Sequence, residues 1–389
     1  MSKTRKISIA FPLDFNSRGA QNKYAPMIEK IGDRVENVYG IRSFKDKNDN
    51  KPNMVVTWIP SLVSWHIVKR LQKIFKYPAY YTYLSNVFCF DLIMAKRIAR
   101  DNSEILFTSP LLKNTVKCAK QAGKIVVVEA GNSEPEREYK RVSEDYLKYK
   151  INNKYIYGDP IYKNICKENF ENADFIISIS KVSLNTYRES GYDLKKFKLI
   201  SLAGTDFEKQ KEIITGRRKR AFITTAFHSF IKGTHRLLLA WRKAEIRDIP
   251  LIIVGNLCED IKQFIDENGP FDNVIFVGPQ SNLAEWYLDY DAVGILLSLS
   301  EGAVRVVPEM MSFGFPMITS MDASCDLVKN NENGFVVDVF NENDIIDKLR
   351  YFAEDWDRVK QMRKTVLQSV SKRSIRDFSI ELADFLSGL

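Results

Sequence analysis

The stretch Ser298–Ser320, SLSEGAVRVVPEMMSFGFPMITS, carries the clearest structural pattern in the chain. It follows the apolar run Ala292–Leu297 (AVGILL), which predicts a buried strand. Pro308 lies where a helix would begin, and proline suits a first helical turn because its φ is already fixed and its missing N–H costs nothing. Another apolar run, Pro316–Ser320, comes next. The order strand, glycine-containing turn, helix and strand predicts a parallel α/β sheet.

Apolar runs of the same kind recur along the whole chain, each followed by a longer stretch with helical spacing. Runs this uniformly apolar are typical of strands that helices cover on both faces. In the second half the predicted strands are Ala221–Ala226, Pro250–Gly255, Asn273–Gly278, Ala292–Leu297, Pro316–Ser320 and Gly334–Val339. In the first half they are Lys6–Phe11, Glu104–Thr108, Lys124–Glu129, Asp174–Ser180 and Lys198–Leu202. The sequence therefore predicts an α/β fold of two Rossmann-like, doubly wound parallel-sheet domains that face a cleft.

The two sets of strands are separated by Asp206–Arg220, a charged segment without a strong apolar period. A chain of 389 residues has room for two domains at roughly 100–200 residues each. We expect an N-terminal domain over residues 1–205, a linker over 206–220 and a C-terminal domain over 221–370. Residues 371–389 are predicted to form a helix that could pack back on the N-terminal domain.

Several classes of protein are disfavoured by composition. The first residues, MSKTRKISIAFPLDF, lead directly into a predicted strand, and no run of 18 or more apolar residues occurs, so we expect a cytoplasmic protein without a membrane span. The five cysteines are scattered without a C-x-x-C pair and the chain has three histidines, which disfavours a disulfide framework or a structural zinc site. His66 and His235 are expected to be packing or surface residues.

The net charge of +9 is divided unequally between the two halves. Residues 1–205 hold 35 Lys and Arg against 21 Asp and Glu, a net charge of +14, whereas residues 206–389 hold 23 against 28, a net charge of −5. A basic first half suggests an anionic partner such as a membrane surface, a nucleic acid or an acidic substrate. The alternative is a solvated, lysine-rich surface.

Two glutamates, Glu301 and Glu309, are separated by seven residues at the predicted turn and helix start. The start of a helix presents free backbone N–H groups and a positive dipole end, which suit an anion such as a phosphate. Ionised carboxylates accept hydrogen bonds only, and the hydroxyls of sugars and riboses are suitable donors. The alternative reading is that the two glutamates are helix caps or surface acids.

This stretch resembles the E-x7-E signature of the family-4 retaining glycosyltransferases, which have the two-domain GT-B architecture. Phe227–Trp241, FHSFIKGTHRLLLAW, looks like the strand, loop, Lys-Gly and helix segment of the family. The runs PLIIVGN, NVIFVGP and GFVVDV follow in the usual order, and ADFIISISK and LISLAGTDF resemble the segments that close the family's first domain. The resemblance covers the second half throughout, and the first 120 residues in pattern only.

The resemblance implies a hexosyltransferase that moves a sugar from a nucleotide-sugar donor, UDP- or GDP-linked, to a lipid-linked or surface-polysaccharide acceptor. The donor would occupy the C-terminal domain and the acceptor the basic N-terminal domain. No cofactor is implied besides the donor itself. Such an enzyme would serve polysaccharide biosynthesis at the cell envelope, from the inner face of the membrane.

By resemblance, Glu309 would bind the ribose, and Glu301 would be the catalytic carboxylate that binds hydroxyls of the donor sugar. Lys232 would bind the diphosphate, with a solvated lysine at a helix start as the alternative. The backbone amides that would face the donor belong to Gly302, Ala303 and Val304.

The chain departs from the family at three places. Where the family has an arginine before the lysine, this chain has His228 and Ser229, and His228 takes its place as a candidate donor-binding residue. Arg305 or the run Arg217–Arg220 would have to compensate for the missing arginine, although that run could equally be a solvated linker.

The family histidine after the third strand of the first domain is replaced by VVVEAGN, which makes Glu129 or the nearby Asn132 the candidate on the acceptor side. The glycine-rich loop after the first strand keeps only Gly19, with Asn16 and Ser17 as substitutes. No D-x-D follows a predicted strand, and no metal-ligand set is apparent, so a mechanism without a metal ion is favoured.

The segment Pro60–Tyr83 alternates basic and apolar residues at helical spacing. A helix with an apolar face and basic residues on either side of it can lie in the headgroup layer of a membrane. The residues expected to make that contact are Trp65, Lys69, Arg70, Lys73, Phe75 and Lys76. The alternative is a helix that packs its apolar face on the first sheet with its lysines in water.

Two other functions fit parts of the sequence. A protein that binds the sugar nucleotide without turnover would explain the missing arginine and histidine. A nucleic-acid-binding protein would explain the basic first half, but the chain contains no recognised nucleic-acid-binding module.

Overall fold

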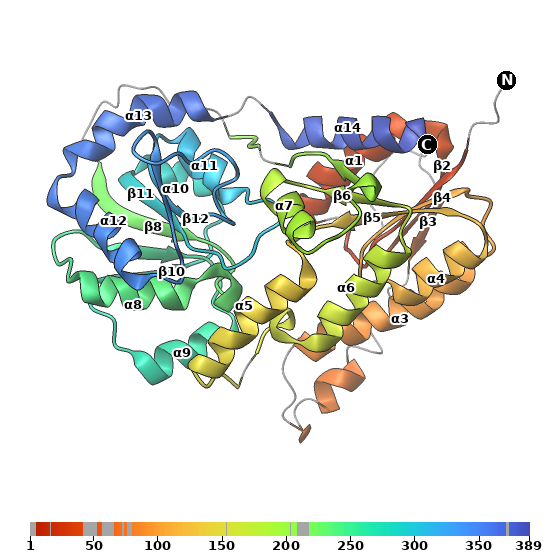
Figure 1. The fold of residues 1–389 in the computed structure, drawn as a ribbon, viewed down its shortest axis with the longest axis horizontal. Coiled ribbons are helices and arrows are strands. Elements are labelled where there is room, and N and C mark those ends of the chain that lie inside the picture. Colours follow the sequence, from red (N-terminus) through yellow and green to blue (C-terminus); the bar gives the residue numbers. More distant parts are fainter. Residues whose placement is uncertain are drawn as a thin grey trace.

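The computed structural model describes residues 5–15, 17–41, 53–56, 66–71, 74–75, 80–152, 154–202, 204–207, 218–370 and 373–389. They form two α/β domains that lie side by side (Figure 1). Each domain contains one sheet, and every strand pair in both sheets is parallel. The predicted fold class is confirmed.

The sheet of the first domain has seven strands in the order β3-β2-β1-β4-β5-β6-β7. Their bounds are β1 (Ile7–Ala10), β2 (Val35–Gly40), β3 (Asn53–Val56), β4 (Ile105–Thr108), β5 (Ile125–Ala130), β6 (Phe175–Ser178) and β7 (Phe197–Leu199). Strands β2 and β3 were not predicted. Polar residues such as Glu36 and Asn37 interrupt the apolar run in β2, as happens in a strand near the edge of a sheet.

The sheet of the second domain has six strands in the order β10-β9-β8-β11-β12-β13. Their bounds are β8 (Lys219–Thr225), β9 (Leu251–Val254), β10 (Val274–Gly278), β11 (Tyr290–Leu296), β12 (Met317–Ser320) and β13 (Gly334–Val337). Strand β8 already includes Lys219 and Arg220, the last residues of the expected linker, while residues 208–217 lie outside the described part of the chain.

Helices cover both faces of the first sheet. On β4 and β5, Ile105, Phe107 and Val127 point to one face, and Leu106 and Val126 to the other, because side chains alternate along a strand. The first face packs against α1 (Arg18–Ile31) and α14 (Ile375–Gly388), and the second against α3 (Tyr80–Ile98), α4 (Lys113–Gln121) and α6 (Pro160–Asn172). Helix α7 (Lys181–Glu189) follows β6.

The apolar residues of the second sheet and of the helices around it form one large core. Its helices are α8 (Thr234–Ala244), α9 (Glu259–Asn268), α10 (Leu283–Leu288), α11 (Val306–Ser312), α12 (Glu342–Glu354) and α13 (Asp357–Ser369). Trp241 on α8 and Trp356 before α13 both pack edge-on against Phe222 of β8, which joins helices from distant parts of the sequence.

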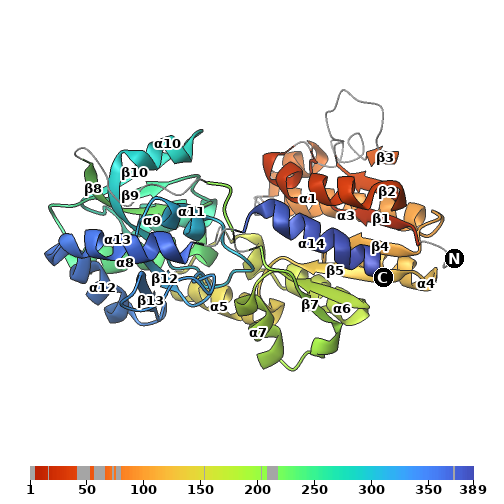
Figure 2. The ribbon, with the colours of Figure 1, turned by 90° about the horizontal axis from the view of Figure 1, so that it is seen from above.

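The last helix, α14, follows the second domain in sequence but packs on the first. Figure 2 shows it beside α1. A capping box starts the helix, since Ser374 Oγ accepts from Asp377 N and the Asp377 carboxylate accepts from Ser374 N. Phe378, Leu382 and Leu386 are then buried in the core that includes α1.

Helix α5 (Pro135–Lys148) makes the opposite crossing. It follows β5 of the first sheet, yet Val142 and Tyr146 belong to the apolar core of the second domain. The Tyr146 ring lies 5.0 Å from that of Phe230, and its hydroxyl donates to Asp260 at 2.8 Å. Each domain therefore contributes one helix to the core of the other.

Candidate active site

The loop between β11 and α11 carries Glu301 to the interface of the two domains. Its carboxylate Oε1 accepts hydrogen bonds from Lys232 Nζ at 2.5 Å and from Ser298 Oγ at 2.6 Å. Glu301 is 6% exposed and the Lys232 side chain 27% exposed. The two residues, 69 positions apart in sequence, thus form a partly buried ion pair.

Lys232 reaches Glu301 because Gly233 lets two backbone segments approach. Gly233 has a φ of 68°, in the left-handed region, and an added Cβ would lie 1.9 Å from Leu297 O. A side chain there would be both strained and in collision. Leu299 N also donates to Ile231 O at 2.7 Å, so the short helix η4 (Phe230–Lys232) lies directly against the Glu301 loop.

Gly302, Ala303 and Val304 face different parts of the molecule. An added Cβ on Gly302 would lie 2.0 Å from Gly131 O of the first domain, so only glycine fits at this contact. Ala303 packs against the core of the first domain, whereas Val304 is buried in the core of the second. The three residues therefore form the point where the loop passes between the domains.

Glu309 lies on α11, beside a cavity. Arg305 Nη2 lies 3.5 Å from Glu309 Oε1, and both residues line this cavity of about 580 Å³. The Nε of Arg305 is buried without a hydrogen-bond partner in the described part of the chain. The other lining residues are Asp206, Phe207, Gln280, Ser281, Asn282, Leu283, Ala284, Glu285, Leu288 and Phe313.

His228 is buried completely and both of its ring nitrogens are used within the domain. Nε2 lies 3.0 Å from Val254 O, which can only accept, so Nε2 carries the proton and Nδ1 accepts from Thr234 Oγ1 at 2.9 Å. Burial lowers the pKa of His228 to about 4, which keeps the ring neutral. The geometry gives the imidazole a role in shaping the loop before Lys232 and leaves no ring nitrogen for a ligand.

Of the two acceptor-side candidates in the first domain, Asn132 lies against Gly302 and hydrogen-bonds to Glu138, whereas Glu129 does not join this cluster. The Glu129 carboxylate accepts from Lys23 Nζ at 2.5 Å and from Tyr24 hydroxyl at 3.3 Å, both on α1. Burial, with the Glu129 carboxylate beside it, raises the pKa of Tyr24 well above its usual value. Glu129 thus lies in a buried ion pair on the α1 face of the first sheet.

The loop after β1 serves mainly to start α1. Ser17 is the N-cap of that helix and its Oγ accepts from Ala20 N at 3.4 Å. An added Cβ on Gly19 would meet no atom within 4 Å, so no close approach requires a glycine there. Asn16 lies outside the described residues.

Helix α5 brings charged residues to the interface that the sequence pattern did not reveal. Arg137 and Arg141 both donate to the Asp322 carboxylate, at 2.6 and 2.7 Å. Asp145 accepts from Arg236 and lies 2.7 Å from His235 Nε2. His235 is therefore buried at a domain interface. On sequence alone, α5 resembles an ordinary solvated helix with mixed charges, so nothing marks these residues.

The same helix places Glu138 against the Glu301 loop, where Ser300 Oγ donates to Glu138 Oε2 at 2.9 Å. Burial raises the pKa of Glu138 to about 8. A second carboxyl group therefore lies near the Lys232–Glu301 pair, and it comes from the other domain.

Within the described residues, no group of three or more His, Cys, Asp and Glu side chains could hold a metal ion. The described helices also include none that is both long and apolar enough to cross a membrane.

Comparison with known proteins finds similarity to glycosyltransferases, chiefly in the second domain. The family model described as "Glycosyl transferases group 1" matches residues 205–368. A Haemophilus influenzae protein described as an uncharacterized glycosyltransferase is 22% identical over 215 residues. That match covers 54% of this chain and 58% of the relative, so the chain spans little more than half the length of that curated relative.

Solved structures share the architecture of the whole chain. Sucrose-phosphate synthase from Thermosynechococcus elongatus has a TM-score of 0.68 at 15% identity and covers 99% of this chain and 98% of its own. Anabaena HepE, solved with UDP and glucose, has a TM-score of 0.63 at 15% identity and covers 99% and 100%. WaaG, a glycosyltransferase involved in lipopolysaccharide biosynthesis, has a TM-score of 0.64 at 12% identity and covers 98% and 100%. The fold is that of the GT-B glycosyltransferases.

Proposed function

We propose that the protein is a family-4 retaining glycosyltransferase that transfers a hexose from a UDP- or GDP-linked donor to a lipid-linked or surface-polysaccharide acceptor. The observation that carries the proposal is the Lys232–Glu301 pair, whose loop continues to Arg305 and Glu309, two residues that line the cavity. The match of the group 1 model to residues 205–368 supports it independently.

In this proposal the nucleotide occupies the cavity of about 580 Å³. Cavities of this size suit a small organic ligand with a few polar contacts. Glu309 accepts hydrogen bonds from the ribose hydroxyls, as an ionised carboxylate can only accept. Support for a nucleotide diphosphate comes from the HepE structures, whose ligands are UDP, UDP-glucose, or UDP with glucose.

The reacting sugar lies next to Glu301 and Lys232 in this proposal. Glu301 accepts from sugar hydroxyls, and Lys232 supplies positive charge to the departing diphosphate. Arg305 is a second cation, which lines the cavity and whose side chain is 39% exposed. We propose that these two cations neutralise the negative charge of the departing diphosphate, as a divalent ion does in other transferases.

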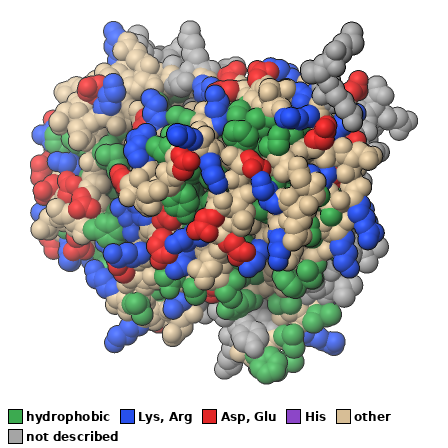
Figure 3. Space-filling model, turned by 45° about the vertical axis from the view of Figure 1, so that its right-hand side comes forward, with side chains coloured by type: hydrophobic (Ala, Val, Ile, Leu, Met, Phe, Trp, Pro, Cys, Tyr) green, Lys and Arg blue, Asp and Glu red, His purple; other side chains and the backbone are tan. Residues whose placement is uncertain are grey.

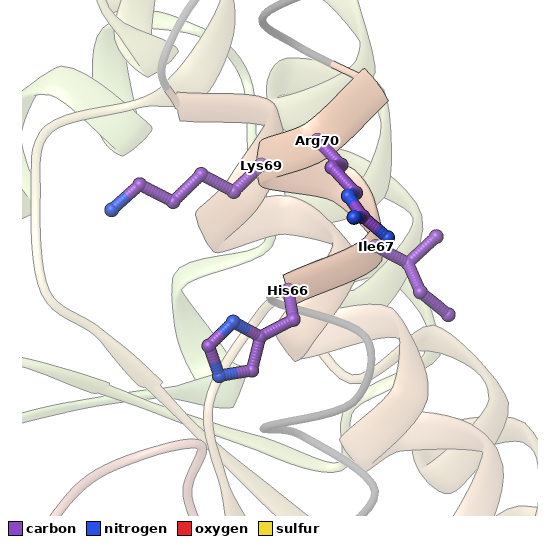
Figure 4. Close-up of a pocket in the computed structure, with 4 residues that line it drawn as sticks. All are labelled: His66, Ile67, Lys69 and Arg70. Atoms are coloured by element: carbon purple, nitrogen blue, oxygen red, sulfur yellow. The ribbon is translucent and has the colours of Figure 1, made fainter.

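We also propose that the first domain binds the acceptor at a membrane surface. In the described residues 66–71 and 74–75, Ile67, Leu71, Ile74 and Phe75 are 40 to 68% exposed, so this apolar set is not packed against the first sheet. Figure 4 shows Lys69 pointing away from the side on which Ile67 and Arg70 lie. Exposed apolar residues flanked by cations on two sides suit an anionic headgroup layer. Trp65, Lys73 and Lys76, expected to contribute, lie outside the described residues.

The face seen in Figure 3 shows no single cluster of basic side chains. Lys and Arg side chains are spread across that face with acidic side chains between them.

A thermal-shift panel of UDP, GDP, ADP and CMP, each with and without its sugar, tests the proposal. A ligand at ~100 times its dissociation constant should stabilise the fold by about 2.7 kcal/mol. The expected result is a shift with UDP or GDP that is reduced in Glu309→Gln. No shift with any nucleotide in the wild type would refute the assignment.

A binding protein without turnover is the second candidate. The Lys23–Glu129 ion pair favours it, because the Glu129 carboxylate proposed for the acceptor side already binds Lys23. Transfer or hydrolysis of the donor separates the two functions. Binding without any release of nucleoside diphosphate would favour the silent protein.

A further inference from the structure

Glu138 lies on the face of α5 that is turned toward the second domain. It shares that face with Val142 and Asp145, at the i+4 and i+7 positions, which both contact second-domain residues. Glu138 itself is 1% exposed. A carboxyl group so deeply buried requires partners, and its partners identify what it does.

The first domain bonds to four consecutive residues of the Glu301 loop. Arg141 Nη1 donates to Leu299 O at 2.8 Å, and Glu138 accepts from Ser300 Oγ at 2.9 Å. Ser133 Oγ donates to Glu301 O at 2.9 Å, and Ser180 Oγ donates to Gly302 O. Every residue from 299 to 302 is thus positioned by a side chain from the other domain.

Among these four contacts, the one from Glu138 is the only one made by a side chain that can change charge near neutral pH. The pKa of Glu138 is raised to about 8, chiefly by burial and also by the nearby Glu301, while hydrogen bonds from Ser300 and Asn132 and the charge of Lys232 lower it. Its other titratable neighbours are Tyr157, Tyr162, Cys166 and Tyr187, all in the first domain. At neutral pH the carboxyl is therefore protonated, and Lys232 faces one carboxylate instead of two.

We propose that Glu138 is a positioning residue of the transfer site, which holds the Glu301 loop through Ser300 and, while neutral, leaves Lys232 paired with Glu301. This inference rests on the proposed function, since it assigns Glu301 and Lys232 to donor binding. When Glu138 ionises, a second carboxylate competes for Lys232, and the loop and the donor site both change. The protein thus has a site whose geometry depends on a carboxyl group from the opposite domain.

The test compares Glu138→Gln, which mimics the neutral acid, with Glu138→Ala and with the wild type. Glu136→Gln is the matched control, because Glu136 lies on the same helix but pairs with Lys163 and Lys167 at the surface. Two quantities are measured from pH 6.5 to 9.5: amide exchange of residues 297–305 in the ligand-free protein, corrected for intrinsic rates, and the dissociation constants of UDP and GDP.

In the wild type, loop protection and nucleotide affinity should fall as pH rises through about 8. Glu138→Gln should match the wild type at pH 7 and lose this pH dependence, and Glu136→Gln should keep it. Glu138→Ala should accelerate loop exchange about tenfold at all pH values, the size expected for one lost buried hydrogen bond.

Loop exchange in Glu138→Ala equal to that of the wild type, or an unchanged pH profile in Glu138→Gln, would overturn the inference. If Glu138→Ala does not fold, the profile of Glu138→Gln still decides. A loop response as expected, with no nucleotide bound by any variant, supports the contact and overturns the proposed function instead.

Discussion

The two domains share one architecture but differ in how their proposed functional residues are brought together. In the second domain, Lys232, Glu301 and Glu309 follow the carboxyl ends of β8 and β11, two strands that pair directly. In the first domain, Glu129 pairs with Lys23 on α1, and Ser17 caps that helix. Residues that follow neighbouring parallel strands meet at the same edge of the sheet, so their proximity can be predicted from the sequence. The contacts of a residue with a helix from elsewhere in the chain cannot be predicted from the local sequence.

The largest expected effect concerns Glu301, at the centre of the second-domain cluster. Glu301→Gln should lower turnover about 100-fold, the range seen when one group that stabilises a transition state is removed. Release of nucleoside diphosphate from the donor identified by the thermal-shift panel measures it. Glu332→Gln, at an exposed position of the same domain, is the control. Equal turnover in Glu301→Gln and Glu332→Gln would show that Glu301 has no special role, and the second domain would then have no demonstrated catalytic carboxylate.

Substitution of one glycine in each domain compares how strongly stability depends on the two positions. Gly302→Ala should destabilise the protein by about 1–3 kcal/mol, because a Cβ would collide with the backbone of Gly131 and overpacked sites cost that much. Gly19→Ala, in α1 with open space around it, should be neutral or slightly stabilising because alanine favours a helix. Urea unfolding of both variants measures the difference, and a stable Gly302→Ala would show that the domains can separate there without cost.

Glu309→Gln should weaken nucleotide binding about tenfold, as expected for hydrogen bonds to a charged acceptor, with little change in turnover at saturation. Calorimetry with the free nucleoside diphosphate measures this. Wild-type affinity in the variant would remove Glu309 from the ribose site and leave Glu301 alone as the functional glutamate.

In the first domain, Lys69→Ala and Arg70→Ala should each reduce binding to anionic vesicles about fivefold, since a basic residue near such a surface contributes about 1 kcal/mol. Flotation with phosphatidylserine vesicles measures the effect, which should shrink as salt rises. Donor binding in the second domain should be unaltered. Flotation of both variants at the wild-type level would count against the membrane contact.

The smallest expected effect is that of a chelator. Transfer in excess EDTA should proceed at the untreated rate, because Lys232 and Arg305 are proposed to neutralise the diphosphate. Loss of activity that Mg²⁺ or Mn²⁺ restores would contradict this.

The sequence was most informative where structure is local. Each of the six strands of the second sheet contains an apolar run, and each was predicted within a few residues of its bounds. Strand β2 was missed because polar residues break its apolar run, and β3 because its apolar run is short. The burial of His228 was not foreseen, because its partner Val254 lies on β9, distant in sequence. Glu138 could not be found from the sequence. Its neighbours Glu134 and Glu136 suggest a solvated acidic surface, and only the crossing of α5 buries it.

The reciprocal placement of α5 and α14 limits how this chain could be recombined. A hybrid enzyme made by joining its residues 1–205 to the second domain of a relative would keep an α5 shaped for Asp260, Asp322 and Phe230, residues that the hybrid no longer contains. It would also place a foreign last helix on α1. Swapping the second domain together with α5 and the surface of α1 would respect the packing. The unit of exchange in this protein is therefore discontinuous in sequence.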